Sequence, residues 1–174
     1  MFFRQSMINK FIIQNKKKLI TYDKKIVKKI KSLAKKNYKK RARLCMHLDL
    51  KDKTNEMIIA LNKKSFIAPH IHPNNKSESY YVLEGSMRVY VFNKNGKVIK
   101  KINMGTYESG KTFFYRMSKG YYHMPISTSR WCVYHEVYSG PFKKEVDVRY
   151  PKWSPDENNS SEVKKFLKKI NFIK

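Results

Sequence analysis

The stretch HIHPNNKSESYYVLEG, residues 70–85, decides how the rest of the chain is interpreted. His70 and His72 are separated by one residue, and on an extended chain such side chains project from the same face. The prolines on either side of the pair limit ladder pairing, so we expect the pair near the end of a strand. Glu78 opens a second apolar segment, which ends at Gly85, and the loop before it can return its carboxylate to the two imidazoles.

A third imidazole follows much later in the chain. His123 stands after Gly120 in the segment SKGYYH, residues 118–123, where a turn can direct it back toward the first pair. Three neutral imidazoles and one carboxylate form a mixed nitrogen and oxygen donor set that suits Fe, Mn, Ni, Zn or Cu. The sequence therefore predicts one divalent metal ion, of unspecified identity, held by His70, His72, Glu78 and His123.

These residues are surrounded by short segments in which apolar and polar residues alternate, with the period of half-buried strands. They are 41–50, 56–61, 65–72, 78–85, 86–93, 97–102, 111–117, 122–127 and 131–138. Turn signals separate them, and Asn95-Gly96 is a strong signal for a tight hairpin. This spacing of strands and turns predicts an all-β sandwich or barrel.

Each end of the chain has a pattern typical of a helix. Residues 23–40 repeat apolar positions at helical spacing with Asp23 as the N-cap, and residues 160–173 do the same with Ser160 or Ser161 as the cap. We therefore expect an N-terminal basic helical extension at 1–40, a barrel at 41–142, and a C-terminal surface segment with a helix at 143–174.

The formal net charge of +26 is concentrated at the ends, in residues 16–40 and 164–169. Such a field attracts polyanions, but no nucleic-acid-binding motif accompanies it. We interpret the lysines as a solvated coat and do not expect nucleic acid as a partner. With no apolar run long enough for a signal core or a transmembrane segment, and no disulfide framework from Cys45 and Cys132, we expect a cytoplasmic protein.

The two metal-ligand segments resemble the paired motifs of the cupin superfamily. The first cupin motif is HxH, a short gap, Glu, six residues and Gly, and residues 70–85 match it with a gap of five residues where three or four are commoner. The second motif is PxG, two residues and His, and residues 118–123 match it with Ser118 in place of the proline. The resemblance implies a double-stranded β-helix, or jelly-roll barrel, and the longer gap leaves Glu84 open as a substitute for Glu78.

A further resemblance, to the WbuC family of cupin-fold metalloproteins, extends over roughly residues 26–157. It rests on AKKNYKKRARLCMHLD, EMIIAL, PHIHPNNKSESYYVLEG, GYYHMP, HEVYSGPF and YPKWSPDE, which occur in this order. The family implies a single-domain metal-binding cupin, often encoded among genes for O-antigen or other surface polysaccharides.

Several other residues are candidates for proton transfer or substrate binding beside the metal. His47, His135 and Tyr81 are candidate proton carriers, and Arg41 and Arg43 are candidates for binding an anionic substrate, with packed or solvated positions as the alternatives. Glu136 is a candidate general base, but it alternates with His135 along one strand, so only one of the two can face inward.

We expect a metal-dependent enzyme of isomerase or epimerase type, acting on a small anionic metabolite such as a sugar or nucleotide-sugar. One alternative is an Fe(II) dioxygenase of cupin type. Another is a non-catalytic metal-binding or sugar-binding module whose basic termini dock on a polyanion. An exposed edge strand would permit a homodimer.

Overall fold

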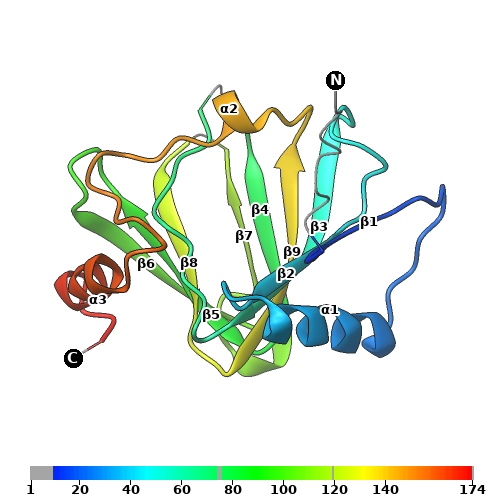
Figure 1. Cartoon of the computed structure of the whole chain (residues 1–174), viewed down its shortest axis with the longest axis horizontal. Helices are drawn as coiled ribbons and strands as arrows, with labels where there is room; N and C mark the ends of the chain where they lie inside the picture. The colour runs from blue at the N-terminus through cyan, green and yellow to red at the C-terminus, as the bar shows by residue number, and fades with distance from the viewer. Residues whose placement is uncertain (1–9, 74–75, 119, 174) are drawn as a thin grey trace, which may run out of the picture.

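The structure, a computed structural model, describes residues 10–73, 76–118 and 120–173. The first nine residues of the expected N-terminal extension, the middle of the loop between His72 and Glu78, Lys119 of the second motif, and Lys174 lie outside the described residues. Two β-sheets enclose a common interior, and a helix from each end of the chain packs on the outside (Figure 1). The expected all-β jelly-roll with two terminal helices is confirmed.

The larger sheet has six strands in the order β1-β2-β3-β9-β4-β7, and the smaller sheet has three in the order β6-β5-β8. The larger sheet comprises β1 (Ile12–Gln14), β2 (Arg41–Cys45), β3 (Thr54–Asn62), β9 (Trp131–Ser139), β4 (Glu78–Glu84) and β7 (Phe114–Met117). The smaller comprises β6 (Val98–Gly105), β5 (Ser86–Phe92) and β8 (Tyr122–Ser127). All strand pairs are antiparallel except β1 with β2. Several neighbouring strands, such as β3 and β9, are far apart in the sequence, so the sheet brings distant parts of the chain together.

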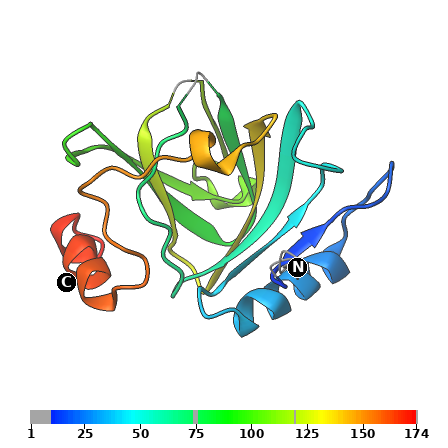
Figure 2. The same ribbon diagram turned by 45° about the horizontal axis from the view of Figure 1, so that its top comes forward.

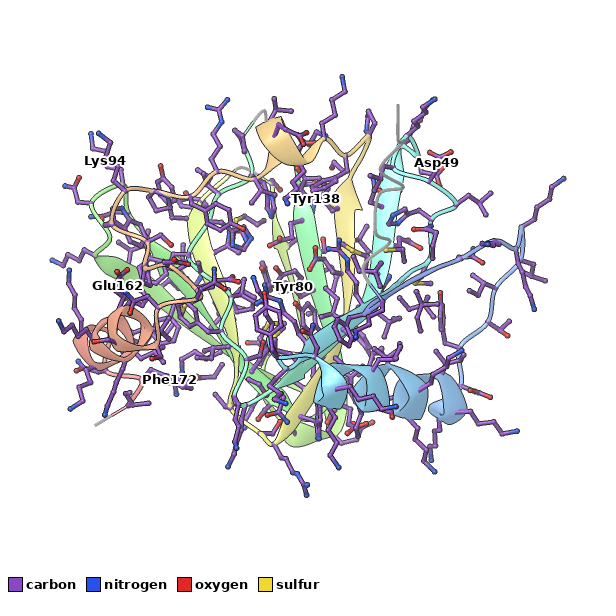
Figure 3. The ribbon with its side chains drawn as sticks, viewed as in Figure 1. Asp49, Tyr80, Lys94, Tyr138, Glu162 and Phe172 are labelled. Carbon is purple, nitrogen blue, oxygen red and sulfur yellow. The ribbon has the colours of Figure 1, made fainter. Side chains whose placement is uncertain are left out.

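The barrel interior is filled by apolar and aromatic side chains from both sheets. They include Met57, Tyr80, Met87, Met104 and Tyr134, all buried. Figure 3 places Tyr80 between the two sheets. Because successive side chains of a strand point to opposite faces, the residues between these positions face the outer helices.

Helix α1 (Lys24–Lys36) covers the outer face of the larger sheet. The Asp23 side chain accepts hydrogen bonds from the backbone N–H groups of Lys25 and Ile26, as expected of an N-cap. Ile30 and Ala34 are fully buried against β2 and β3, while the lysines on the opposite side of the helix are mostly exposed. Burial of this narrow apolar stripe fastens the helix to the barrel.

The C-terminal region crosses one end of the barrel before it ends beside the smaller sheet (Figure 2). It contains the short helix α2 (Lys144–Asp147) and then α3 (Ser160–Lys169), whose Phe166 packs on the outer face of the smaller sheet. The expected cap of α3 was wrong, because Asn159 caps it and accepts from the N–H groups of Ser161 and Glu162. Among the described residues, no helix is long and apolar enough to cross a membrane.

One expected strand was also wrong. Residues 65–72 do not form a strand but run as an extended segment with isolated bridges, His70 to His123 and Ile71 to Arg149. Proline lacks a backbone N–H, so Pro69 and Pro73 keep a longer ladder from forming. In addition, residues 12–14 of the extension form strand β1, and the short helix η1 (Tyr107–Ser109) follows β6.

Candidate metal centre

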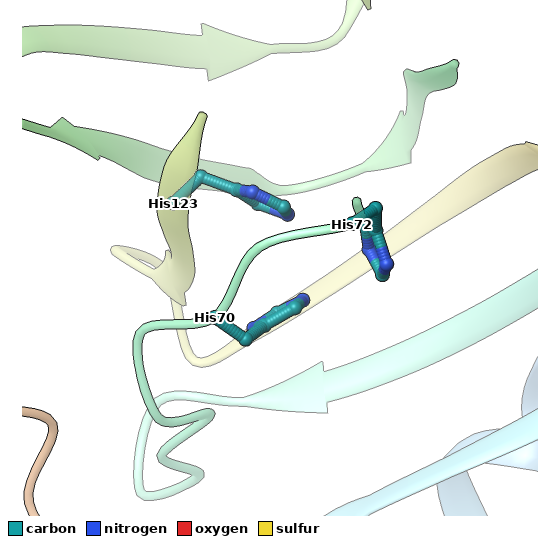
Figure 4. A group of neighbouring side chains, drawn as sticks. All are labelled: His70, His72 and His123. Atoms are coloured by element: carbon teal, nitrogen blue, oxygen red, sulfur yellow. The ribbon is translucent and has the colours of Figure 1, made fainter. Parts of the chain in front are cut away.

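Three histidines from two segments meet in the barrel interior, as Figure 4 shows. The backbones of His70 and His123 pair directly, with N–H to carbonyl distances of 3.1 and 2.8 Å. One ligand nitrogen from each of His70, His72 and His123 lies within 4.8 Å of the other two. All three residues are buried, and His123 has no exposed surface. The predicted spacing therefore brings the three imidazoles to one point.

The lack of a side chain at Gly120 allows the two segments to approach. A Cβ atom at this position would collide with the backbone carbonyl oxygen of His72. The glycine of the second motif thus has a steric role: it lets the chain that leads to His123 lie against the His70–His72 segment.

Each imidazole is oriented by the main chain. Its Nδ1 atom lies within hydrogen-bond distance of a backbone carbonyl: Ala68 for His70 (2.9 Å), Asp147 for His72 (2.7 Å) and Tyr121 for His123 (2.9 Å). A carbonyl oxygen can only accept, so Nδ1 carries the hydrogen and Nε2 of a neutral ring carries the free lone pair. This is the tautomer that a metal ligand requires.

The carbonyl that holds His72 belongs to α2 at the end of the barrel. The Asp147 side chain accepts from the backbone N–H of Lys143 and pairs with the Lys76 ammonium at 2.8 Å, and it is almost fully buried. Asp147 thereby fixes the short helix whose backbone orients His72. A residue distant in sequence from the ligands contributes to their geometry.

Glu78 completes the cluster. Its Oε2 lies 3.1 Å from Nε2 of His72 and accepts a hydrogen bond from the Tyr80 hydroxyl at 3.0 Å. Its Oε1 lies 3.2 Å from Nε2 of His123 and accepts from the Tyr115 hydroxyl at 2.8 Å. The carboxylate is thus held in place by two tyrosines while it faces two imidazoles.

The polar atoms of this cluster fit a bound cation. The buried Nε2 of His123 has no hydrogen-bond partner among the described residues. With the Nδ1 atoms protonated, the Nε2 lone pairs of neutral His72 and His123 face an electron-rich carboxylate, which is unfavourable without a proton or a metal ion between them. Three imidazoles and a carboxylate are ligands that Zn, Fe, Mn, Ni or Cu accepts.

Electrostatics at the site keep His70 neutral and Glu78 charged, the forms in which these two groups bind a metal ion. Burial, together with His123 and His72, lowers the pKa of His70 to about 3, so this ring stays neutral. Burial alone would raise the pKa of Glu78, but His123 and His72 hold it well below its usual value. Burial also lowers the pKa of His123, and the charge of Glu78 outweighs this and raises it. The carboxyl group therefore carries a negative charge in the interior.

Two of the three predicted proton carriers do not reach this cluster. His135 of β9 pairs with Tyr81 of β4, and both alternate with side chains that face the interior. They lie on the outer face of the sheet, where Tyr81 contacts the Phe113 ring. His47 follows β2 and accepts at Nδ1 from the Glu56 N–H at 3.1 Å, with its buried Nε2 unpartnered in the described structure. Their catalytic roles stay predictions.

The remaining predicted residues have different surroundings. Arg41 pairs with Glu157 at 2.9 Å and donates to the Phe66 carbonyl, so it anchors the C-terminal segment. Arg43 faces the interior. Glu84, the alternative carboxylate, pairs at 2.5 Å with Lys31 of α1, outside the barrel. Of the two carboxylates that the sequence left open, the structure brings Glu78 to the histidines.

Only one of Glu136 and His135 can face inward, and Glu136 is the one that does. It stands between the inward-facing Tyr134 and Tyr138 on β9 and opposite Tyr80 on β4. Burial and the charge of Glu78 raise its pKa to about 7. No sequence signal separates Glu136 from His135, because β9 carries buried residues on both of its faces.

Comparisons with known proteins agree with this architecture. A family described as "Domain of unknown function (DUF6016)" matches residues 22–104. No curated protein matches the chain. The capsular polysaccharide assembling protein CapF from Staphylococcus aureus superposes with a TM-score of 0.51 and 14% identity, over 64% of this chain and 31% of that chain.

Two other solved structures superpose less well. Oxalate oxidase in complex with glycolate has a TM-score of 0.49 and 12% identity, over 66% of this chain and 56% of its own. Protein SO0799 from Shewanella oneidensis has a TM-score of 0.49 and 13% identity, over 59% and 65%. This chain thus spans less than two thirds of each of these three structures. The likeness to CapF shows the fold, a cupin barrel, and it is the fold expected from the two motifs.

Proposed function

We propose that this chain is a metal-dependent cupin enzyme that holds one divalent ion through His70, His72 and His123, with Glu78 as the fourth ligand. The observation that carries the proposal is the common orientation of the three rings. Each Nδ1 is occupied by a backbone carbonyl, so three Nε2 atoms are left to converge beside one carboxylate. A purely structural role would leave the buried Nε2 of His123 without a hydrogen-bond partner among the described residues.

The proposed reaction is an isomerisation or epimerisation of a small anionic, sugar-like metabolite. A bound divalent ion supplies Lewis-acid polarisation of a substrate oxygen. Tyr80 and Tyr115 keep their protons, because burial and the charge of Glu78 raise both pKa values well above 10, and they hold Glu78 by donating to it. Glu136, with a pKa of about 7, is the inward-facing group suited to take up and return a proton.

Surface polysaccharide synthesis is the proposed setting of this activity. The resemblance to the WbuC family supports it, and so does the likeness to CapF, a capsular polysaccharide assembling protein. The two buried, unpaired cysteines, Cys45 and Cys132, are compatible with a reducing compartment, so we propose a cytoplasmic location.

Elemental analysis of the purified chain tests the metal site. We expect about one equivalent of a divalent metal, and its loss in His70→Ala and in His123→Ala because each change removes one of three imidazole ligands. His135→Ala is the matched control, since this histidine lies on the outer face, and it should keep the metal. Circular dichroism checks that each variant is folded.

A folded chain that cannot be loaded with Fe, Mn, Ni, Zn or Cu would refute the proposal. An oxygen-uptake assay after anaerobic reconstitution separates the two enzymatic forms. Uptake with iron alone would favour the dioxygenase over the isomerase.

A further inference from the structure

Arg43 and Glu136 also face the barrel interior, beside the metal cluster. Ala42 and Leu44 of β2 pack under α1, so Arg43 between them points to the other face. There Arg43 lies close enough to Cys45, which lies in the interior, to lower the pKa of its thiol against the effect of burial. Glu136 of β9 reaches the same surface, because Cys45 pairs with Met57 and Met57 pairs with Glu136 across three neighbouring strands.

Neither charge is held in an ion pair within the described residues, although Arg43 is near enough to counteract in part the raised pKa of Glu136. Within the described residues, no carboxylate forms an ion pair with Arg43, and no hydrogen bond or ion pair reaches the carboxyl group of Glu136. The Nε atom of Arg43 is buried without a hydrogen-bond partner. Partly buried charged groups without such partners are unfavourable, so they mark a place where a ligand gains from binding.

These side chains are also reachable from solvent. Arg43, Glu136 and Tyr115 each keep part of their surface accessible, while Tyr80 and Tyr134 beside them are fully buried. Glu136 also lies close enough to the cluster for Glu78, His72 and His123 to influence its charge. A small molecule that touches Arg43 and Glu136 would therefore lie next to the metal centre.

The chemistry of the two groups defines what they recognise. A guanidinium binds a planar carboxylate through two parallel hydrogen bonds, and a carboxylate accepts a hydrogen bond from a hydroxyl. One unpaired guanidinium matches the single charge of a carboxylate better than the roughly two charges of a phosphate. We infer that the barrel binds a sugar acid, with its carboxylate on Arg43 and a hydroxyl on Glu136. This inference rests on the proposed function and names its substrate class.

Isothermal titration calorimetry of the metal-loaded chain with D-glucuronate and D-glucose tests the inference, because the two rings differ only in the carboxylate. We expect glucuronate to bind at least tenfold more tightly than glucose. Arg43→Met should remove this preference, while Glu136→Gln should weaken both sugars alike, since both offer the hydroxyl. Arg116→Met is the matched control on the exposed face of β7 and should change nothing.

The metal content of every sample separates the two claims. A wild-type chain that takes up no metal refutes the proposed function. A metal-loaded chain that binds both sugars equally, or that keeps its preference in Arg43→Met, overturns the sugar-acid inference. If Arg43→Met does not fold, Arg43→Lys keeps the charge but loses the two-point contact, and it should still lose at least tenfold in glucuronate affinity; unchanged affinity would overturn the inference.

Discussion

At the scale of single residues, Glu78 and Glu84 begin and end the same strand but differ in what surrounds their carboxyl groups. Glu78 faces two imidazoles and two tyrosine hydroxyls inside the barrel, whereas Glu84 is partly exposed and pairs with Lys31. Only Glu78 can therefore offset the positive charge of a bound metal ion. Six positions separate Glu78 from Glu84, so a regular strand would put both on one face, but a register shift between Val82 and Glu84 places Glu84 opposite Val133, which packs on the outer face.

We expect Glu78→Gln to lower metal affinity at least tenfold, because it removes the one anionic donor while keeping the size of the side chain. Competition with a chromophoric chelator measures the affinity. Glu84→Gln is the control and should bind metal as the wild type does. Equal affinity in the wild type and Glu78→Gln would exclude Glu78 as a ligand.

At the scale of elements, α1 shows how little apolar surface is needed to hold a basic helix in place. Ile30 and Ala34 have no exposed surface, and their neighbours on the opposite side of the helix are lysines. The helix therefore depends on packing with β2 and β3, since its own side chains offer no acidic partners within Lys24–Lys36.

Ile30→Ala should lower the free energy of unfolding by about 2–5 kcal/mol, because it leaves a cavity between α1 and the larger sheet. Urea denaturation measures the loss. Lys28→Ala on the exposed side should change stability by no more than about 0.5 kcal/mol. A similar loss in both variants would mean that α1 does not pack as described.

At the scale of the whole molecule, Glu157 joins the C-terminal segment to the barrel. It accepts from Arg41 and Lys39 at 2.9 Å each and from the backbone N–H of Ala68 at 2.9 Å. Burial alone would raise the pKa of Glu157, but these three donors outweigh it and hold the pKa below the usual 4.5. One carboxylate thus links three segments that are far apart in sequence.

This linkage predicts a loss of stability in acid. Below about pH 4.5 the unfolded chain binds a proton at Glu157 that the folded chain does not yet bind, so falling pH favours unfolding. The contribution is complete above that pH and is gone once the pH falls below the folded pKa. Glu157→Gln should cost about 1.5–3 kcal/mol at pH 7 and should flatten the acid side of a pH–stability curve. An unchanged acid limb would contradict this role.

The sequence was sufficient to predict the barrel, both terminal helices and the convergence of the histidines, because these depend on local period and short spacing. It could not predict which side chains of β9 point into the barrel. Val133 is buried under α1 and Tyr134 is buried in the barrel interior, so the alternation of residues does not show which of His135 and Glu136 faces inward. Nor could it pair Arg41 with Glu157, because 116 positions separate them.

The orientation of the three imidazoles by backbone carbonyls has an evolutionary consequence. The groups that aim these rings are present in every amino acid, so no particular side chain is needed at Ala68 or Tyr121 for the carbonyl to accept, whereas at Asp147 the side chain also holds α2 in place. Substitutions around the ligands can accumulate as long as the path of the main chain persists. A site of this construction can outlast most of the sequence in which it arose.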